Sequence, residues 1–228
     1  MALILNIDTA LDTSCISLTE GGRDLLSAFN DRQKDHAAWI QVAIRNLMKE
    51  TGLAMEKLDA VGVNIGPGSY TGVRIGLSAA KGICYALSIP LITETSLRLL
   101  AFSAIKYLET SSFRPLLNKI LICPMIDARR MEVFTSIYDS NLKELMEAQA
   151  CILSTNSFEE LLKRQKILFL GNGSIKFQSV CRNPEAMFEK IPLNPAALSA
   201  LTYENFIGNN FADLTYTNPL YLKEFFTK

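Results

Sequence analysis

The sequence has a single histidine, His36, and none of its five cysteines forms a CxxC pair. One histidine excludes HExxH motifs and two-histidine metal sites, and no nucleophile elbow pairs with it for a Ser–His–Asp triad. The cysteine count is odd, and Cys15, Cys84 and Cys123 lie in apolar runs, as expected for free thiols in a reducing cytoplasm. Histidine-based zinc enzymes and disulfide-stapled secreted domains are therefore excluded.

Net charge and long apolar runs are also lacking. Lys+Arg and Asp+Glu both number 23, whereas a protein that grips nucleic acid alone usually has a basic excess. No window approaches about 18 uninterrupted apolar residues, and the N-terminus MALILNIDTA has an acid too early for a signal peptide. We therefore expect a cytoplasmic protein without a membrane span. Its 228 residues suffice for one large domain or two lobes.

The first half of the chain shows a recognisable order of elements, β-β-β-α-β-α-β-α. This order is typical of the RNase H-like lobe found in actin, Hsp70 and sugar kinases. Asp35 is a good N-cap and Gly52 a good C′ residue for the first helix. The expected strands cover 3–8, 15–19, 24–29, 61–65 and 91–93, and the expected helices cover 35–51, 69–87 and 96–108.

The stretch 110–118 marks a lobe boundary. We predict an α/β protein with the actin-like ATPase (ASKHA) fold: an N-terminal lobe over 1–109 and a smaller, truncated second lobe over 110–228, whose C-terminal segment packs back on the first. The sequence shows no internal repeat. In the second lobe the expected strands cover 120–126, 132–138, 143–153 and 167–170, and the expected helices lie near 157–165 and 196–207.

The helix expected over 69–87 organises the rest of the chain. Apart from a polar stripe of Arg74, Ser78, Lys81 and Tyr85 it is apolar or glycine, so it must be covered on more than one side. Its outer face is either a protein–protein interface or packs under another element of this chain. The candidate interface residues on this helix and on 35–51 are Trp39, Ile40, Ala43, Ile44, Leu47, Val73, Gly76, Leu77, Ala79, Ala80, Ile83 and Leu87.

Three turns support a second hypothesis, the binding of ATP or ADP with magnesium. Asp8 and Thr9 end the first strand, where this architecture embraces phosphate, but the turn lacks the usual glycine. Asp8 either holds a metal through water or caps a turn. The remaining candidates are Asp127 and the loop glycines Gly171 and Gly173. Asp127 lies in a turn with two acids and two arginines. These side chains either serve a phosphate ligand or neutralise one another.

The glycine-rich segment 66–72 is a different case. Val73 stands where a P-loop has its lysine, and Thr71 stands where a dinucleotide fingerprint has a glycine. A tight turn from strand to helix explains these glycines better than a phosphate cradle does.

Together the motifs resemble one family. IDTA over 7–10, GPGSYTGVRIG over 66–76, IDARRMEVF over 126–134 and YLK over 221–223 occur in the order and approximate spacing of the TsaB (YeaZ) family, and the resemblance covers essentially the whole chain. It implies a scaffold or activator, not itself an enzyme, for threonylcarbamoyl transfer to adenosine 37 of tRNAs that read ANN codons. The helices 36–51 and 69–87 would bind the paralogue TsaD.

The resemblance also implies the other partners. These are a TsaE-like ATPase, a second copy of the chain in a homodimer, and tRNA only through the complex; no cofactor is firmly implied. His36-Ala37-Ala38 departs from the family's His-Ser-Glu, and the paired metal histidines of TsaD are absent. The alternative is a stand-alone ATP-dependent phosphotransferase or hydrolase of the actin and sugar-kinase fold, using Asp8, Asp127 and the 171–174 loop.

Overall fold

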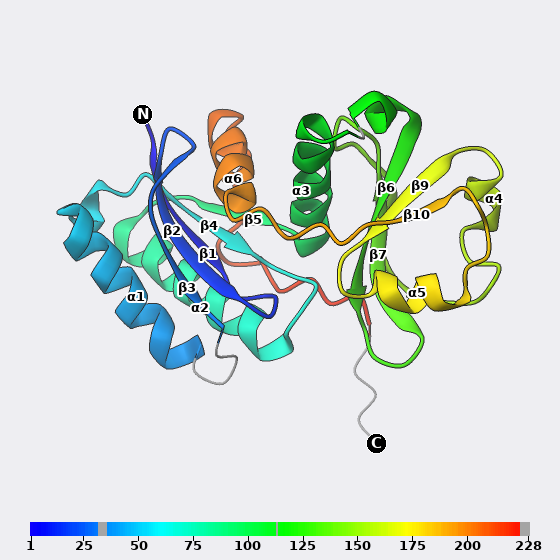
Figure 1. Ribbon diagram of the computed structural model, residues 1–228. Helices are drawn as coiled ribbons and strands as arrows, with labels where there is room; N and C mark the ends of the chain where they lie inside the picture. Colours follow the sequence, from blue (N-terminus) through cyan, green and yellow to red (C-terminus); the bar gives the residue numbers. More distant parts are fainter. Residues whose placement is uncertain (32–35, 113, 224–228) are drawn as a thin grey trace, which may run out of the picture. The chain divides into compact units, whose positions relative to one another are not determined.

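The computed structural model describes residues 1–31, 36–112 and 114–223, and the chain forms two compact units (Figure 1). The first unit contains Met1–Ser96 and Pro195–Leu220, and the second contains Leu97–Asn194 and residues 221–223. The sequence-based division at 109/110 places the helix that begins at Ser96 in the first lobe, whereas the structure groups it with the second unit. The expected N-cap Asp35 lies outside the described residues.

The first unit is built on a five-stranded mixed sheet with the strand order β3-β2-β1-β4-β5. β1 pairs antiparallel with β2 and parallel with β4. Alternation along β1 sends Leu3, Leu5 and Ile7 into one core and Ile4 into another on the opposite face. The strands are β1 (Leu3–Asp8), β2 (Ser14–Glu20), β3 (Arg23–Asn30), β4 (Ala60–Asn64) and β5 (Leu91–Glu94).

Helices cover both faces of this sheet, as Figure 1 shows. α1 (His36–Thr51) and α2 (Tyr70–Leu87) pack on one face, next to the short η2 (Met55–Lys57). α6 (Ala197–Ile207) packs on the other face through Tyr203 and Phe206. Ser69 caps α2 by accepting a hydrogen bond from Gly72 N.

The second unit has its own five-stranded sheet, in the order β10-β9-β6-β7-β8. Its core gathers Phe158, Phe169, Phe177 and Phe188, whose ring centroids lie 4.8 to 5.9 Å apart. The strands are β6 (Ile120–Asp127), β7 (Glu132–Tyr138), β8 (Glu144–Ile152), β9 (Lys166–Leu170) and β10 (Ala186–Phe188). The helices are α3 (Ser96–Thr110), η3 (Arg114–Lys119), α4 (Glu159–Leu162) and α5 (Ser174–Val180).

The two units repeat one topology. In each, three antiparallel strands are followed by a helix, a parallel strand, a helix and a second parallel strand, and the sheet orders correspond strand for strand. This duplication confirms the actin-like, RNase H-like fold expected from the sequence. The second copy is reduced, since the helix after its third strand has four residues where α1 has sixteen.

The segment after α6 stays in the first unit and contacts β5 and α2. Ala212 bridges to Leu91, and Lys81 Nζ donates to the carbonyl oxygens of Thr215 at 3.2 Å and Thr217 at 3.0 Å. Lys81, which the sequence places in the polar stripe of this helix, thus holds the segment through its ammonium group.

All five cysteines are free thiols. Burial raises the pKa of Cys123 to about 12, so this thiol stays protonated at neutral pH. No helix in the described part of the chain is long and apolar enough to cross a membrane.

Candidate functional site

The inner face of α2 lies directly on the turn that follows β1. Gly72 and Gly76 lie on this face and Gly68 lies in the turn just before the helix, and a Cβ atom on any of the three would overlap Thr9 or Ala10. At Gly68 and Gly72 the overlapping atom is a backbone carbonyl oxygen, which cannot move aside. The glycines of the long motif therefore serve close packing between the helix and the turn.

The outer face of α2 is small and largely apolar. Ile75, Ser78, Ala79, Gly82, Ile83 and Ala86 are exposed or partly exposed, and none has a side chain larger than isoleucine. We call these six residues the α2 ridge. A Cβ atom on Gly82 would have no atom of residues 1–31, 36–112 and 114–223 within 4 Å, so these residues leave the ridge open at this point. It ends beside Tyr85, whose side chain is 82% exposed.

The structure divides the twelve residues predicted for the interface into two groups. Eight are buried in the first unit and cannot reach a partner: Ile40, Ala43, Ile44, Leu47, Val73, Gly76, Leu77 and Ala80. The other four, Trp39, Ala79, Ile83 and Leu87, pack on the core with part of their surface exposed. The prediction therefore included residues of the face that covers their own sheet, and the interface itself stays a prediction.

Sequence reasoning missed the most open positions. Gly82, Ala86 and Tyr85 on α2 were not predicted, nor was Val42 on α1, whose side chain is 50% exposed. The signal was present, because Ser78, Gly82 and Ala86 follow one another at intervals of four residues and so share one side of the helix. α1 and α2 pack side by side, so both contribute to this surface.

The Asp8–Thr9 turn is occupied by internal hydrogen bonds. Asp8 Oδ1 accepts from Ala10 N and Asn64 Nδ2, both at 3.0 Å, and Thr9 Oγ1 donates to Gly72 O at 2.6 Å. Ala10 O accepts from Ser69 N at 2.7 Å. Burial raises the pKa of the Asp8 carboxyl, and these hydrogen bonds lower it only in part. The turn that holds phosphate in related folds here forms hydrogen bonds with Ser69 and Gly72 at the start of α2.

In the second unit, Asp127 and the 171–174 loop come together, as the sequence analysis grouped them. Asn172 Oδ1 accepts from Asp127 N at 2.9 Å, and Gly173 N donates to Met125 O at 3.0 Å. Gly171 has a φ of +87°, and a Cβ atom there would overlap Met125 O. The two glycines allow the loop to pack against the end of β6.

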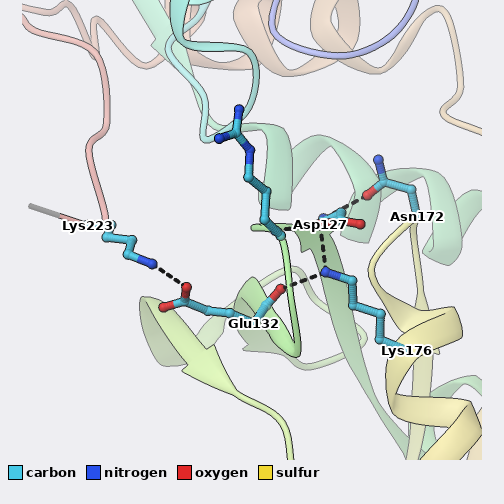
Figure 2. A network of polar contacts seen from close by, with 6 residues as sticks. Asp127, Glu132, Asn172, Lys176 and Lys223 are labelled. Atoms are coloured by element: carbon cyan, nitrogen blue, oxygen red, sulfur yellow. Dashed lines mark hydrogen bonds and ion pairs between the residues drawn. The ribbon is translucent and has the colours of Figure 1, made fainter. Parts of the chain in front are cut away.

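The charged hairpin between β6 and β7 is not neutralised by its own residues (Figure 2). Lys176 Nζ lies 2.7 Å from Asp127 Oδ1 and also donates to Glu132 O at 3.2 Å. The hydrogen bond from Lys176 is the main reason that the pKa of Asp127 is lowered. Glu132 pairs with Lys223 at 2.5 Å, so the motif over 221–223 is joined to the motif over 126–134. The predicted self-neutralised turn is wrong, because lysines from elsewhere supply the counter-charges.

Asp8 and Thr9 belong to the first unit, whereas Asp127, Gly171 and Gly173 belong to the second. Among the residues whose positions are described, no three His, Cys, Asp or Glu side chains are grouped closely enough to hold a metal ion. His36 begins α1 as predicted, but its side chain is outside the described part.

Comparison with known proteins gives consistent results. Residues 30–212 match the family model of TsaD, the tRNA N6-adenosine threonylcarbamoyltransferase. The chain is 31% identical over 172 residues to the tRNA threonylcarbamoyladenosine biosynthesis protein TsaB of Bacillus subtilis (strain 168), over 74% of this chain and 70% of that protein.

Solved structures share the fold. YeaZ from Pseudomonas aeruginosa aligns with a TM-score of 0.75 at 23% identity, over 97% of this chain and all of that one. A Listeria monocytogenes protein assigned as an N-acetylmannosamine kinase aligns with a TM-score of 0.50 at 9% identity, over 91% of this chain and 99% of that one. These likenesses concern the architecture alone.

Proposed function

The chain belongs to the TsaB family, whose members take part in tRNA threonylcarbamoyladenosine biosynthesis, and we propose that within this pathway it is a non-catalytic subunit that binds and activates a TsaD-like paralogue. The proposed acceptor of the threonylcarbamoyl group is adenosine 37 of tRNAs that read ANN codons. The observation that carries the proposal is the α2 ridge, an open helix face without bulky side chains.

The composition of the ridge suits the close approach of another helix. Small side chains let two helix backbones approach, and the partly exposed Ile75 and Ile83 supply apolar area to bury. Tyr85 and Val42 are large exposed side chains at the border of this surface, and tyrosine is frequent among the residues that dominate interfaces. The ridge and the neighbouring part of α1 form one candidate docking surface.

A TsaD-like paralogue is the proposed occupant because this chain matches the TsaD model over residues 30–212, which include α1 and α2. Two chains of one fold carry equivalent helix pairs, and equivalent pairs can meet about a pseudo-two-fold axis. The same geometry supports a homodimer as a competing pairing. We place a TsaE-like ATPase and the tRNA in the complex rather than on this chain alone.

The proposal assigns no nucleotide chemistry to this chain. The hydrogen-bonding groups of the turn after β1 hold α2 in place, and Asp8 is buried and bonded to Asn64. A phosphate-binding turn needs free backbone donors and room for the ligand. The support for an ATP-dependent enzyme is therefore weaker than the support for a docking subunit.

The test is a substitution that changes the surface of the ridge without touching the core. Gly82→Glu places a carboxylate where the chain itself has open space, and the change from glycine favours the helix. We expect this variant to keep its melting temperature but to bind the TsaD-like paralogue of the same organism more than about tenfold less tightly, because an unpaired charge would be buried. Binding is measured by titration and by co-elution.

The matched control is Ile207→Glu, which adds the same charge at a 62% exposed isoleucine of α6, on the opposite face of the sheet. It should bind as the wild type does. Equal loss of binding in both variants, or none in Gly82→Glu, would contradict the placement of the interface on the ridge.

A further inference from the structure

The hairpin between β6 and β7 presents two arginines that the proposed docking role does not use. The side chains of Arg129 and Arg130 are exposed, and neither guanidinium forms a hydrogen bond or ion pair within residues 1–31, 36–112 and 114–223. The acids beside them are engaged elsewhere: Asp127 by Lys176 and Glu132 by Lys223. The two guanidiniums thus keep their charge uncompensated at the hairpin tip.

The backbone of this hairpin is tightly held. Arg129 N donates to Asp127 Oδ1 at 2.6 Å, and Glu132 N donates to Arg129 O at 3.1 Å. Ala128 N donates to Glu132 O at 3.1 Å, and the base is joined to the neighbouring loop through Asn172 (Figure 2). Arg129 and Arg130 have φ values of +70° and +46°, which residues other than glycine rarely adopt. The bonds around the turn fix this conformation, so the arginines are presented from a pre-organised base.

A pair of unneutralised guanidiniums on a fixed turn suits phosphate. Arginine donates planar, paired hydrogen bonds to phosphate oxygens and holds its charge at every physiological pH. A protein partner would need an apolar centre, and the tip offers one partly exposed methionine, Met131. Lys and Arg also outnumber Asp and Glu in the second unit, although the whole chain has a formal charge of zero.

We propose that Arg129 and Arg130 bind backbone phosphates of the tRNA when the chain is part of its complex. The identity of the RNA rests on the proposed function, whereas the preference for phosphate rests on the hairpin itself. Because the contact is to the backbone, it positions the tRNA and does not read its sequence. Asp127, Glu132, Lys176 and Lys223 are positioning residues that hold the tip and keep its arginines free.

The experiment measures tRNA binding by the complex of this chain with the TsaD-like paralogue at several salt concentrations. The variant Arg129→Gln/Arg130→Gln should raise the Kd for an unmodified tRNA transcript by about tenfold near physiological salt, since two charge-assisted contacts are lost. The magnitude of the slope of log K against log salt should decrease by about 1 to 2, which is the contribution of two phosphate contacts. Arg129→Lys/Arg130→Lys should restore the slope.

The control is Arg164→Gln/Lys190→Gln, which removes two exposed cations elsewhere in the second unit and should leave both quantities unchanged. An unchanged Kd and slope in the arginine variant would overturn the proposal. So would a variant that keeps tRNA binding but loses the paralogue, because the arginines would then contact protein. If the wild-type chain does not assemble with the paralogue, the proposed function fails, and the same titration on the isolated chain decides the phosphate contact by itself.

Discussion

At the scale of single residues, Asp8 is the acidic side chain whose ionised form is most clearly disfavoured by burial. It is a buried carboxyl whose pKa is raised above 3.8 by burial, although Ala10 N and Asn64 Nδ2 donate to it. The folded state therefore holds the Asp8 proton more tightly than the unfolded chain does. Its contribution to stability is complete below pH 3.8 and is lost as the pH rises through the folded pKa.

Asp8→Asn should remove this loss. Asparagine keeps the oxygen that accepts both hydrogen bonds and carries no charge, so the variant should be more stable than the wild type at neutral pH. The difference should shrink toward zero as the pH falls toward 3.8. Thermal unfolding of both proteins between pH 4 and pH 8 measures this trend.

The same pair of proteins tests the alternative of a nucleotide enzyme. Magnesium and ATP should shift the melting temperature of neither protein. A shift in the wild type that Asp8→Asn abolishes would mean that Asp8 serves a ligand, and the account of this turn as a seat for α2 would be wrong.

Single residues also show where sequence reasoning ends. The sequence predicted Asp8 at the end of a buried strand, and the structure places it there. It did not reveal the partner of Asp8, since Asn64 lies 56 positions away on the neighbouring strand β4. Likewise, the lysines that neutralise Asp127 and Glu132 come from α5 and from the segment 221–223. Contacts between residues so distant in sequence have no local pattern to reveal them.

At the scale of elements, α2 is defined by its two faces. Both Gly72 and Gly82 lie within the helix, but a Cβ atom on Gly72 would overlap Thr9, whereas one on Gly82 would meet no atom of the described residues within 4 Å. The apolar pattern predicted a helix over 69–87, and the structure has α2 over Tyr70–Leu87. The sequence pattern could not show which glycines are buried, because a glycine has no side chain whose polarity would indicate the buried or the exposed face.

The two glycines give a matched pair of substitutions. Gly72→Ala should destabilise the protein by about 1 to 3 kcal/mol, because the new methyl group overlaps the carbonyl oxygen of Thr9. Gly82→Ala should stabilise it by about 0.5 to 1 kcal/mol, since alanine favours the helix and meets nothing. Urea unfolding of the three proteins measures both. Equal effects would contradict the packing of α2 on the turn.

At the scale of the whole molecule, the chain is a duplicated fold whose second copy has been reduced. The sequence indicated the first copy through its order of elements, and the structure confirms that order. The repeat itself was not detectable, because the strand order of a sheet is set by pairing, and unrelated apolar sequences satisfy the same pairing. The start of the second unit was equally hidden, since it coincides with the start of α3, and the pattern of a helix does not tell which sheet the helix packs on.

The architecture bears on the proposal that this chain is a non-catalytic subunit. The first unit keeps the sheet and helices of the fold, while the turn after β1 is committed to packing under α2. The outer side of α1 and α2 is accessible, and the proposal assigns it to the paralogue. Activity would then belong to the assembled complex, with this chain contributing surface rather than chemistry.

The most direct test is reconstitution of threonylcarbamoyladenosine on tRNA. The TsaC-, TsaD- and TsaE-like proteins of the same organism are combined with wild-type chain, with Gly82→Glu, with Ile207→Glu or with no addition. The account predicts that product forms with the wild type and with Ile207→Glu, and that it falls by at least about tenfold with Gly82→Glu and without the chain. Full product from the three other proteins alone would contradict the central claim that this chain is the activating subunit.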